Sequence, residues 1–420
     1  MRRHYFPPLT PFPLLPPLFV TGVPVSPLLS SVSPTSRAHL YDLLLSYHQL
    51  RGGPHTPKAQ RTLHSRQQHY LSWCTRMHLR PELPSISQPD RNMIIALFIL
   101  SLAQGNTIKC ISIKESTAKR YMSAACDFSK RLHFPDPSLD QRGARAAPIN
   151  RVLHEMKRWD SMPNRKEPIT PAIVDTMRSF APSDNPDHLH SALLDWNILG
   201  QFYGFRSSEW AQNVENRKNL PLRAIDGSPL AFIFSDITFF DKKHRRLTKA
   251  FSKPLDPNDV HEVEFRWRFQ KNLDNGQCIT QVKRPNSPLC PVAAALRIRE
   301  RARRLNSSTH DVLAVFADKK GATSFITTDL ITSFLQRAAA QTYNITKKSD
   351  LKQWTPHSMR VGACVLLNEQ GYSFDFIKLR LRWRSDAFRD YLRNTRILAS
   401  HHSTAVCTSQ PAPVPLTSSP

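Results

Sequence analysis

Four residues, spread from position 206 to position 391, could together cleave a phosphodiester bond. His357 and Arg360 lie three positions apart, Tyr391 follows after a basic and aromatic run, and Arg206 lies well upstream. Arginine stays protonated, and its planar fork can hold a phosphate through two parallel hydrogen bonds. A tyrosine that attacks phosphorus must lose its proton, and a nearby histidine can accept that proton. This chemistry requires no metal and no nucleotide cofactor.

The spacing of His357 and Arg360 places both side chains on one face of a helix. Pro356 suits the first turn of that helix, and Thr355 is the expected N-cap. A helix N-terminus also favours a bound phosphate, because its free N–H groups point outward. The competing interpretation is a pair of solvated polar residues on an exposed helix face.

Arg206 follows an apolar segment, 193–204, that is expected to be a helix. Gly204 would let the chain turn there, so that the guanidinium points outward. Glu209 lies three residues after Arg206 and is within reach to orient it. The competing interpretation is an ordinary Arg/Glu pair at the end of a helix.

Trp383 and Tyr391 belong to one basic and aromatic stretch, 381–391. The indole N–H of Trp383 could donate a hydrogen bond to a phosphate. Both residues could equally be ordinary members of the core, which is the commoner fate of a single tyrosine or tryptophan.

The order of these motifs resembles the catalytic domain of the tyrosine recombinases, the phage-integrase family. Gly-Phe-Arg-Ser-Ser-Glu, a hairpin, Pro-His-Ser-Met-Arg and Arg-Trp-Arg-Ser-Asp-Ala-Phe-Arg-Asp-Tyr follow one another in the same direction. The resemblance covers about residues 165–398. The last motif is similar to the branch encoded by eukaryotic mobile elements, the DIRS-type retrotransposons and the Cryptons.

The resemblance implies a catalytic role for each of the residues above. Arg206 and Arg360 would hold the scissile phosphate, and Tyr391 would attack it to form a 3′-phosphotyrosyl link. His357 would accept the tyrosine proton.

The remaining catalytic positions depend more heavily on the resemblance. The family places a lysine on a hairpin, which here indicates Lys271 as the donor of a proton to the leaving oxygen. Lys242 and Lys243 lie on an earlier turn and are the alternative. Many members have Gly-His or Gly-Trp ahead of the tyrosine, so either Arg382 or Trp383 could fill that position, and Trp383 is preferred.

The fold class predicted from the sequence is α+β and mostly helical, with a small antiparallel sheet. Ser112 and Glu115 have capping-box spacing and predict a helix that continues to about residue 132. Asp274-Asn-Gly276 predicts a hairpin turn. Helices are expected over 38–50, 62–77, 94–103, 149–159, 170–180, 188–205, 291–305, 327–342 and 357–370, and strands over 235–241, 260–269 and 278–282.

Composition shifts divide the chain into two expected domains and two tails. Nine prolines before position 37 predict a disordered or polyproline-like start. The expected divisions are a Pro-rich tail over 1–36, a helical core-binding (SAM-like) domain over 37–160, a linker over 161–168, a catalytic domain over 169–398 and a Ser/Pro-rich tail over 399–420.

The charge of the chain indicates a polyanionic partner. The sequence has 58 Lys+Arg against 33 Asp+Glu, a formal net charge of +25. Double-stranded DNA is the first candidate partner and an anionic membrane surface the second; a merely soluble basic protein is the remaining alternative. The helical core-binding domain offers candidate phosphate contacts at Arg61, Arg66, Lys114, Lys119 and Arg120.

The cysteines and the apolar runs indicate in which compartment the protein is expected and whether a segment could span a membrane. Seven scattered cysteines, with no C-x-x-C pair and no zinc spacing, favour reduced thiols and no metal. The apolar run over 93–102 is too short to span a bilayer. A nuclear location and no membrane partner are expected.

The functional prediction is site-specific cleavage and rejoining of DNA, which would integrate or excise a mobile element. The resemblance implies a homotetramer on two DNA sites and no cofactor. One alternative is a type IB topoisomerase-like enzyme that relaxes a single duplex. Others are a catalytically silent DNA-binding remnant and a basic membrane-surface protein, although no amphipathic basic helix supports the latter.

Overall fold

The computed structural model describes residues 57–81, 83, 86–105, 112–131, 134–161, 165–211, 214–215, 220–221, 227–248, 251–270, 274–392 and 407. The chain divides into two compact units between Met162 and Pro163, a position inside the segment predicted as a linker. The predicted tail over 1–36, the predicted helix over 38–50 and, apart from Cys407, the predicted tail over 399–420 lie outside the described residues. Among the described helices, none is long and apolar enough to cross a bilayer.

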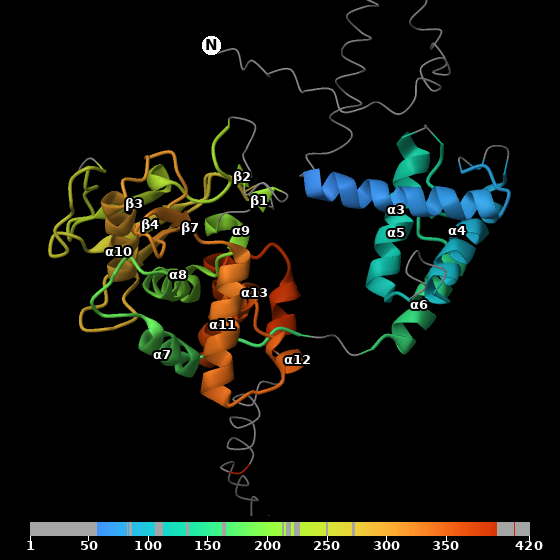
Figure 1. The fold of residues 1–420 in the computed structure, drawn as a ribbon. Helices are drawn as coiled ribbons and strands as arrows, with labels where there is room; N and C mark the ends of the chain where they lie inside the picture. Colours follow the sequence, from blue (N-terminus) through green and yellow to red (C-terminus); the bar gives the residue numbers. More distant parts are fainter. Residues whose placement is uncertain are drawn as a thin grey trace, which may run out of the picture. The chain divides into compact units, whose positions relative to one another are not determined.

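The described part of the first unit consists of helices (Figure 1). Its core includes Tyr70, Trp73 and Phe98, whose rings lie 5.2 to 6.5 Å apart between centroids. The helices are α3 (Pro57–Arg76), α4 (Gln88–Ala103), α5 (Glu115–Arg131) and α6 (Ala147–Trp159).

The predicted capping box at the start of α5 is wrong. The helix begins at Glu115, three residues after Ser112, so the Ser112 side chain is not at the N-cap. The carboxylate of Asp160 instead accepts a hydrogen bond from the Glu115 backbone N–H, at 3.0 Å. A distant residue therefore does what a local motif was expected to do, and it ties the beginning of α5 to the segment after α6.

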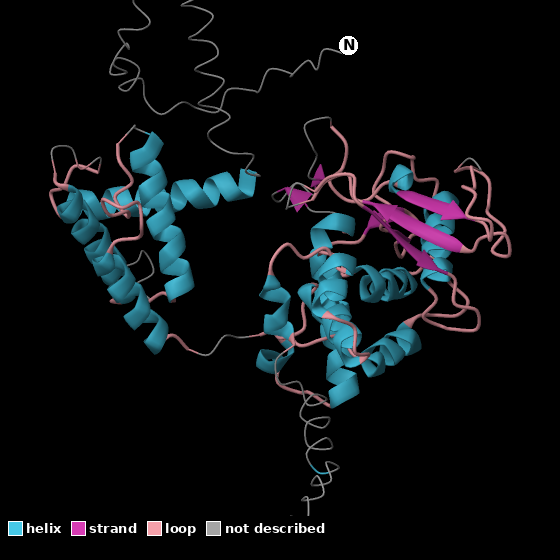
Figure 2. Ribbon diagram, turned by 180° about the vertical axis from the view of Figure 1, so that it is seen from behind, coloured by secondary structure: helices cyan, strands magenta, loops and turns pink. Residues whose placement is uncertain are grey.

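The second unit is α+β and mostly helical, as the sequence predicts (Figure 2). Its largest described sheet is antiparallel, in the order β3-β4-β5. Two short hairpins, β1-β2 and β6-β7, were not predicted. The strands are β1 (Val214–Glu215), β2 (Leu220–Pro221), β3 (Ile237–Phe240), β4 (Glu262–Arg266), β5 (Cys278–Val282), β6 (Val315–Ala317) and β7 (Thr323–Phe325).

Helix α8 (Leu189–Tyr203) is central to the second unit because it is apolar on nearly every side. It contacts α7 (Pro171–Phe180), α10 (Pro291–Arg304) and α13 (His357–Glu369). Aromatic rings around it fill the core. The other helical elements are α9 (Ser207–Trp210), α11 (Thr328–Tyr343), α12 (Lys348–Leu351), α14 (Phe374–Arg380) and the 3-10 helices η3 (Phe234–Asp236) and η4 (Asp386–Tyr391).

The start of α13 differs from the prediction for it. Pro356 occupies the N-cap, in a helical conformation with φ of −52°, and no side chain caps the helix. Thr355 was expected to accept a hydrogen bond there; instead its backbone N–H donates to Ser358 Oγ at 3.1 Å. The Thr355 side chain therefore does not cap α13, and the Ser358 hydroxyl satisfies the backbone N–H of Thr355 instead.

Gly362 brings α13 against the backbone at the start of the second unit. A Cβ at this position would lie 2.6 Å from the carbonyl oxygen of Ile169. No rotation of a side chain can relieve a contact with backbone. Close approach at this helix face therefore requires glycine.

Replacing Gly362 with alanine is expected to lower the free energy of unfolding by about 1–3 kcal/mol through overpacking. Because the 2.6 Å contact is with backbone and cannot be relieved by a rotamer change, the upper part of this range is expected, which outweighs the roughly 1 kcal/mol that alanine adds in helix propensity. The change is measured from the denaturant midpoint followed by fluorescence of the buried tryptophans. Asn368→Ala, on the same helix, should shift stability by less than about 0.5 kcal/mol. Equal stability of Gly362→Ala and wild type would contradict the expectation.

Candidate active site

Gly204 and Glu209 position Arg206 at the end of α8. Gly204 caps the helix with φ of 56° and ψ of 44°, the left-handed region that glycine favours. Glu209 Oε1 accepts a hydrogen bond from Arg206 Nη1 at 2.9 Å, and Oε2 accepts one from the Arg206 backbone N–H at 3.0 Å. The Arg206 side chain remains 22% exposed, so its guanidinium can meet a ligand.

The carboxylate of Glu209 is shared by two arginines. Burial by itself would raise its pKa, but Arg382, through charge and hydrogen bonds, and Arg206 lower the pKa to about 2. Glu209 is therefore ionised at any physiological pH. It orients Arg206 while remaining fully paired.

Arg360 extends from α13 into the space between Gly204 and the end of α14. Its Nη1 donates to the Gly204 carbonyl oxygen at 2.7 Å, and its Nη2 donates to the Leu381 carbonyl oxygen at 2.9 Å. Burial, then the charges of Arg206 and Arg382, lower the pKa of Arg360 to about 9. Only 1% of Arg360 is exposed. The site therefore concentrates positive charge, and an approaching anion would meet Arg206 first.

His357 and Tyr391 are in direct contact. His357 Nε2 lies 2.8 Å from Tyr391 Oη, a hydrogen-bonding distance. Burial, followed by the charges of Arg360, Arg206 and Lys166, lowers the pKa of His357. Burial raises the pKa of Tyr391, although the charge of Arg360 opposes this. At neutral pH a neutral imidazole therefore faces a protonated phenol, which is the pairing that a proton transfer from tyrosine to histidine needs.

Trp383 contacts both Arg360 and Tyr391. Its ring lies over the Arg360 guanidinium, with 4.0 Å between the guanidinium carbon and the ring centroid, and 5.5 Å from the ring of Tyr391. Arg382, in contrast, turns the other way, is buried and pairs with Glu209. Of the two candidates for the sixth position, only Trp383 contacts Tyr391 and Arg360 through its side chain.

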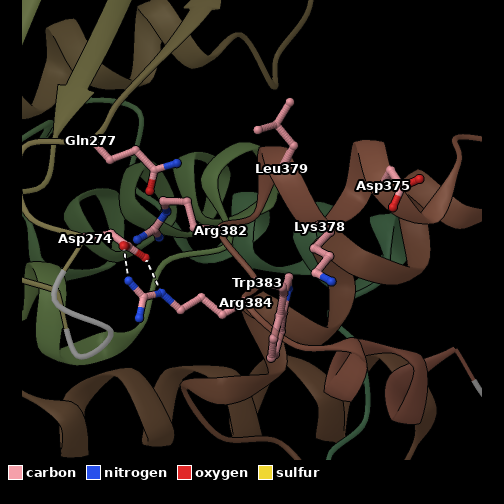
Figure 3. A pocket seen from close by; sticks show the side chains of 8 residues that line it. All are labelled: Asp274, Gln277, Asp375, Lys378, Leu379, Arg382, Trp383 and Arg384. Atoms are coloured by element: carbon pink, nitrogen blue, oxygen red, sulfur yellow. Dashed lines mark hydrogen bonds and ion pairs between the residues drawn. The ribbon is translucent and has the colours of Figure 1, made fainter.

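A surface pocket of about 310 Å³ lies beside Trp383 (Figure 3). Arg384 donates from Nε to Asp274 Oδ2 at 2.8 Å across the pocket. This ion pair links the stretch that carries Trp383 to the turn between β4 and β5. The lining residues are Asp274, Gln277, Asp375, Lys378, Leu379, Arg382, Trp383 and Arg384.

The roles predicted for lysines stay predictions. Lys271 lies outside the described residues, between Gln270 and Asp274, so its role stays a prediction. Lys242 and Lys243 are exposed on the turn after β3. Lys166 was missed: its charge acts on His357, and its Nζ donates to the Lys352 carbonyl oxygen at 2.8 Å. It lies in the predicted linker, where no local pattern marked it.

The predicted phosphate contacts of the first unit lie on or just before two helices. Arg61 and Arg66 lie on α3, and Lys119 and Arg120 lie on α5. Lys114 precedes α5 and donates to the Ser161 carbonyl oxygen at 3.0 Å. Lys119 also forms an ion pair with Glu115, and Arg66 lies 5.9 Å from the Tyr121 ring centroid. Contact with DNA by these residues stays a prediction.

The lowered pKa of His357 has a kinetic consequence. If His357 accepts the Tyr391 proton, the reaction is fully active where the imidazole is neutral. Activity is lost as the pH falls through a midpoint that lies below 6.5, the ordinary pKa of a histidine. His357→Gln should slow the single-turnover reaction by about 100-fold and abolish this acid limb. The measurement is the rate of adduct formation with DNA from roughly pH 5 to pH 8. His310→Gln, at an exposed histidine, is the control; an acid limb that persists in His357→Gln would contradict the role.

Comparison with known proteins gives similarity at the level of structure. No protein-family model and no curated protein matches the chain. The structure is similar to the Tn1549 transposon integrase in complex with transposon right end DNA, with 13% identity, 86% of this chain and 97% of that chain covered and a TM-score of 0.43. The same integrase in complex with circular intermediate DNA has 14% identity, with 76% of this chain and 85% of that chain covered and a TM-score of 0.39. The XerA recombinase has 14% identity, with 85% of this chain and 95% of that chain covered and a TM-score of 0.33. Because the TM-scores lie below 0.5 and the sequence identity is low, the functional conclusion rests on the chain's own residues.

Proposed function

We propose that this chain cuts and rejoins DNA through a covalent 3′-phosphotyrosyl intermediate. One observation carries the proposal: His357 Nε2 lies 2.8 Å from Tyr391 Oη, beside a cluster of arginines. The pair combines a nucleophile and an acceptor for its proton. The arginines supply a binding site for the anion that the nucleophile would attack.

The electrostatics of the cluster favour a phosphodiester as ligand. Three guanidinium groups, of Arg206, Arg360 and Arg382, act on one another and on the single carboxylate of Glu209. A bound phosphate would offset the excess positive charge. Negative charge grows on the non-bridging oxygens as the pentavalent transition state forms. Preorganised cations therefore stabilise that state more than the bound substrate.

The proposed reaction balances without a cofactor. Tyr391 Oη forms a bond to phosphorus, and its proton passes to His357 Nε2. The bond from phosphorus to the 5′ oxygen breaks, and that oxygen gains a proton, which we assign to Lys271. A 5′ hydroxyl of the same or a partner strand then attacks phosphorus and releases the tyrosine. Because the phosphotyrosyl bond retains the energy of the cleaved bond, rejoining needs no ATP.

The biological setting is a further part of the proposal. We assign the chain to integration or excision of a mobile element, as a homotetramer on double-stranded DNA in the nucleus. The support is the likeness of residues 382–391 to the eukaryotic mobile-element recombinases, the net charge of +25 and the seven scattered cysteines.

The test is covalent trapping on nicked duplexes, in which the cleaved fragment diffuses away and rejoining is prevented. Duplexes come from the DNA that flanks the gene. The expected result is a protein–DNA adduct that survives SDS, with the nucleotide mapped to the peptide containing Tyr391. Salt-sensitive DNA binding without any adduct would overturn the proposal in favour of a silent DNA-binding protein. Relaxation of supercoiled DNA by the monomer, without exchange between two sites, would favour a topoisomerase.

A further inference from the structure

Arg382 has a backbone conformation that is unusual for its type. Its φ is +57°, in the left-handed region, where a side chain with a Cβ is strained and glycine is favoured. Its side chain is also buried, with 5% of the residue exposed. Burying an arginine in a strained conformation is unfavourable unless its contacts offset the cost.

The Arg382 guanidinium donates to α9 and to the segment after β4, and its Nη2 also donates to the Tyr203 carbonyl oxygen of α8 at 3.5 Å. Its Nη2 donates to Glu209 Oε2 at 3.0 Å, and its Nη1 donates to Glu209 Oε1 at 3.2 Å. Nη1 also donates to Gln270 Oε1 at 3.2 Å. The guanidinium carbon lies 3.7 Å from the centroid of the Trp267 ring. Arg382 thus bridges the α9 carboxylate that orients Arg206 and the segment that follows β4.

Gln270 links Arg382 to the turn between β4 and β5 through hydrogen bonds. Its backbone N–H donates to Asn275 Oδ1 at 2.8 Å, and its Nε2 donates to the Asp274 carbonyl oxygen at 2.6 Å. Arg384 holds the Asp274 carboxylate at the same turn. Two arginines that flank Trp383 therefore hold the two ends of this turn.

We propose that Arg382 is a positioning residue, which holds Arg206, through Glu209, and the Gln270 end of the β4–β5 turn in register with the segment that carries Tyr391. The proposal rests on the proposed function, because the reaction supplies the need for this register. Arg382 itself touches no reacting atom. It acts by keeping parts from three distant stretches of the chain in one geometry.

The geometry makes a sharp prediction for Arg382→Gly. Glycine accepts the left-handed backbone, so the turn before Trp383 is kept while the bridge is lost. Adduct formation at saturating DNA should slow by about 100-fold, the size expected for a small misplacement of catalytic groups. The DNA concentration for half-saturation should change by less than about threefold, because Arg382 is buried. Arg382→Lys should remain slow, since an ammonium cannot reproduce the fork to Glu209 and Gln270.

A double-mutant cycle separates positioning of Arg206 from a general loss of stability. Arg382→Gly should slow the Arg206→Ala protein by much less than the roughly 100-fold by which it slows wild type, because a large part of its effect on the phosphate passes through Arg206. Rate losses that multiply would overturn this route. Arg178→Ala, which removes one exposed arginine from α7, is the matched control for charge and should match wild type.

Hydrogen exchange of the full chain without DNA tests the same network independently of activity. In Arg382→Gly, the backbone amides of 200–211 and of the described residues within 262–282 should exchange about tenfold faster, while those of the first unit are unchanged. Unchanged exchange in both segments, or a normal adduct rate, would overturn the positioning role alone. Faster exchange in a protein whose wild type forms no adduct would overturn the proposed function and leave the network as a structural feature.

Discussion

Tyr391→Phe is expected to form no SDS-resistant adduct with a nicked duplex while still binding that duplex. Phenylalanine keeps the ring, which packs 5.5 Å from Trp383 and 5.3 Å from His357 between centroids. It removes only Oη, the atom that would bond to phosphorus. Burial raises the pKa of the Tyr391 phenol, so the neutral hydroxyl would attack only as its proton passes to His357.

The matched control is Tyr372→Phe, which removes the hydroxyl of an exposed tyrosine in the same unit. Its adduct yield should equal that of wild type. Gel separation of adducts after SDS, with DNA binding measured in parallel, gives both readouts from one set of samples. An adduct that persists in Tyr391→Phe would place the nucleophile on another residue and contradict the reaction proposed for this site.

Arg206→Ala is expected to slow adduct formation by about 100- to 1,000-fold, the usual effect of removing one preorganised donor from a charged transition state. The side chain is partly exposed, and its loss leaves Glu209 paired with Arg382 at 3.0 Å. No buried carboxylate is left without a partner, so the free energy of unfolding should change by less than about 1 kcal/mol. The effect should therefore fall on the rate and not on folding.

Arg206→Lys sharpens this test. Lysine keeps the charge but lacks the planar fork, so it should recover only a small part of the lost rate. Arg178→Ala controls for the removal of one surface arginine. Rates are measured in single turnover at saturating DNA, and stability is measured by thermal unfolding. Arg206→Ala with a rate within about threefold of wild type would show that Arg206 does not hold the scissile phosphate.

Arg360→Ala would not separate an effect on the reaction from an effect on folding. Its guanidinium satisfies the carbonyl oxygens of Gly204 and Leu381 inside the protein. Removing both donors leaves buried acceptors unpaired, at a cost of about 1–3 kcal/mol each. A slow Arg360→Ala protein would therefore combine a weaker site with a weaker fold, whereas Arg206 reports on the site by itself.

Local patterns in the sequence predicted the elements that carry the site. Helix α8, which ends just before Arg206, and helix α13, which contains His357 and Arg360, begin and end near the predicted positions, whereas α9, α12 and α14 were not predicted. Gly204 ends α8 in the left-handed conformation, as a glycine after an apolar helix indicates. The hairpins β1-β2 and β6-β7 were missed because strands of two or three residues are too short to show periodicity.

The segment before Tyr391 shows a similar limit. No helix or strand was predicted over 386–391, and the structure has a 3-10 helix over Asp386–Tyr391. Six residues are too few for hydrophobic spacing to reveal this form. Tyr391, the last residue of this 3-10 helix, is in contact with His357.

By itself, the sequence determined the residue types of the site and the short spacings between them. His357 and Arg360 share one helix face because their separation matches a helical turn, and that holds wherever the helix lies. Only the tertiary structure decided that Glu209 serves two arginines and that Arg382 turns into the protein while Trp383 turns toward Tyr391. The contact between Arg382 and Glu209 joins residues 173 positions apart. It depends on the end of α14 lying beside α9, with one buried carboxylate between them, and no local pattern encodes that arrangement.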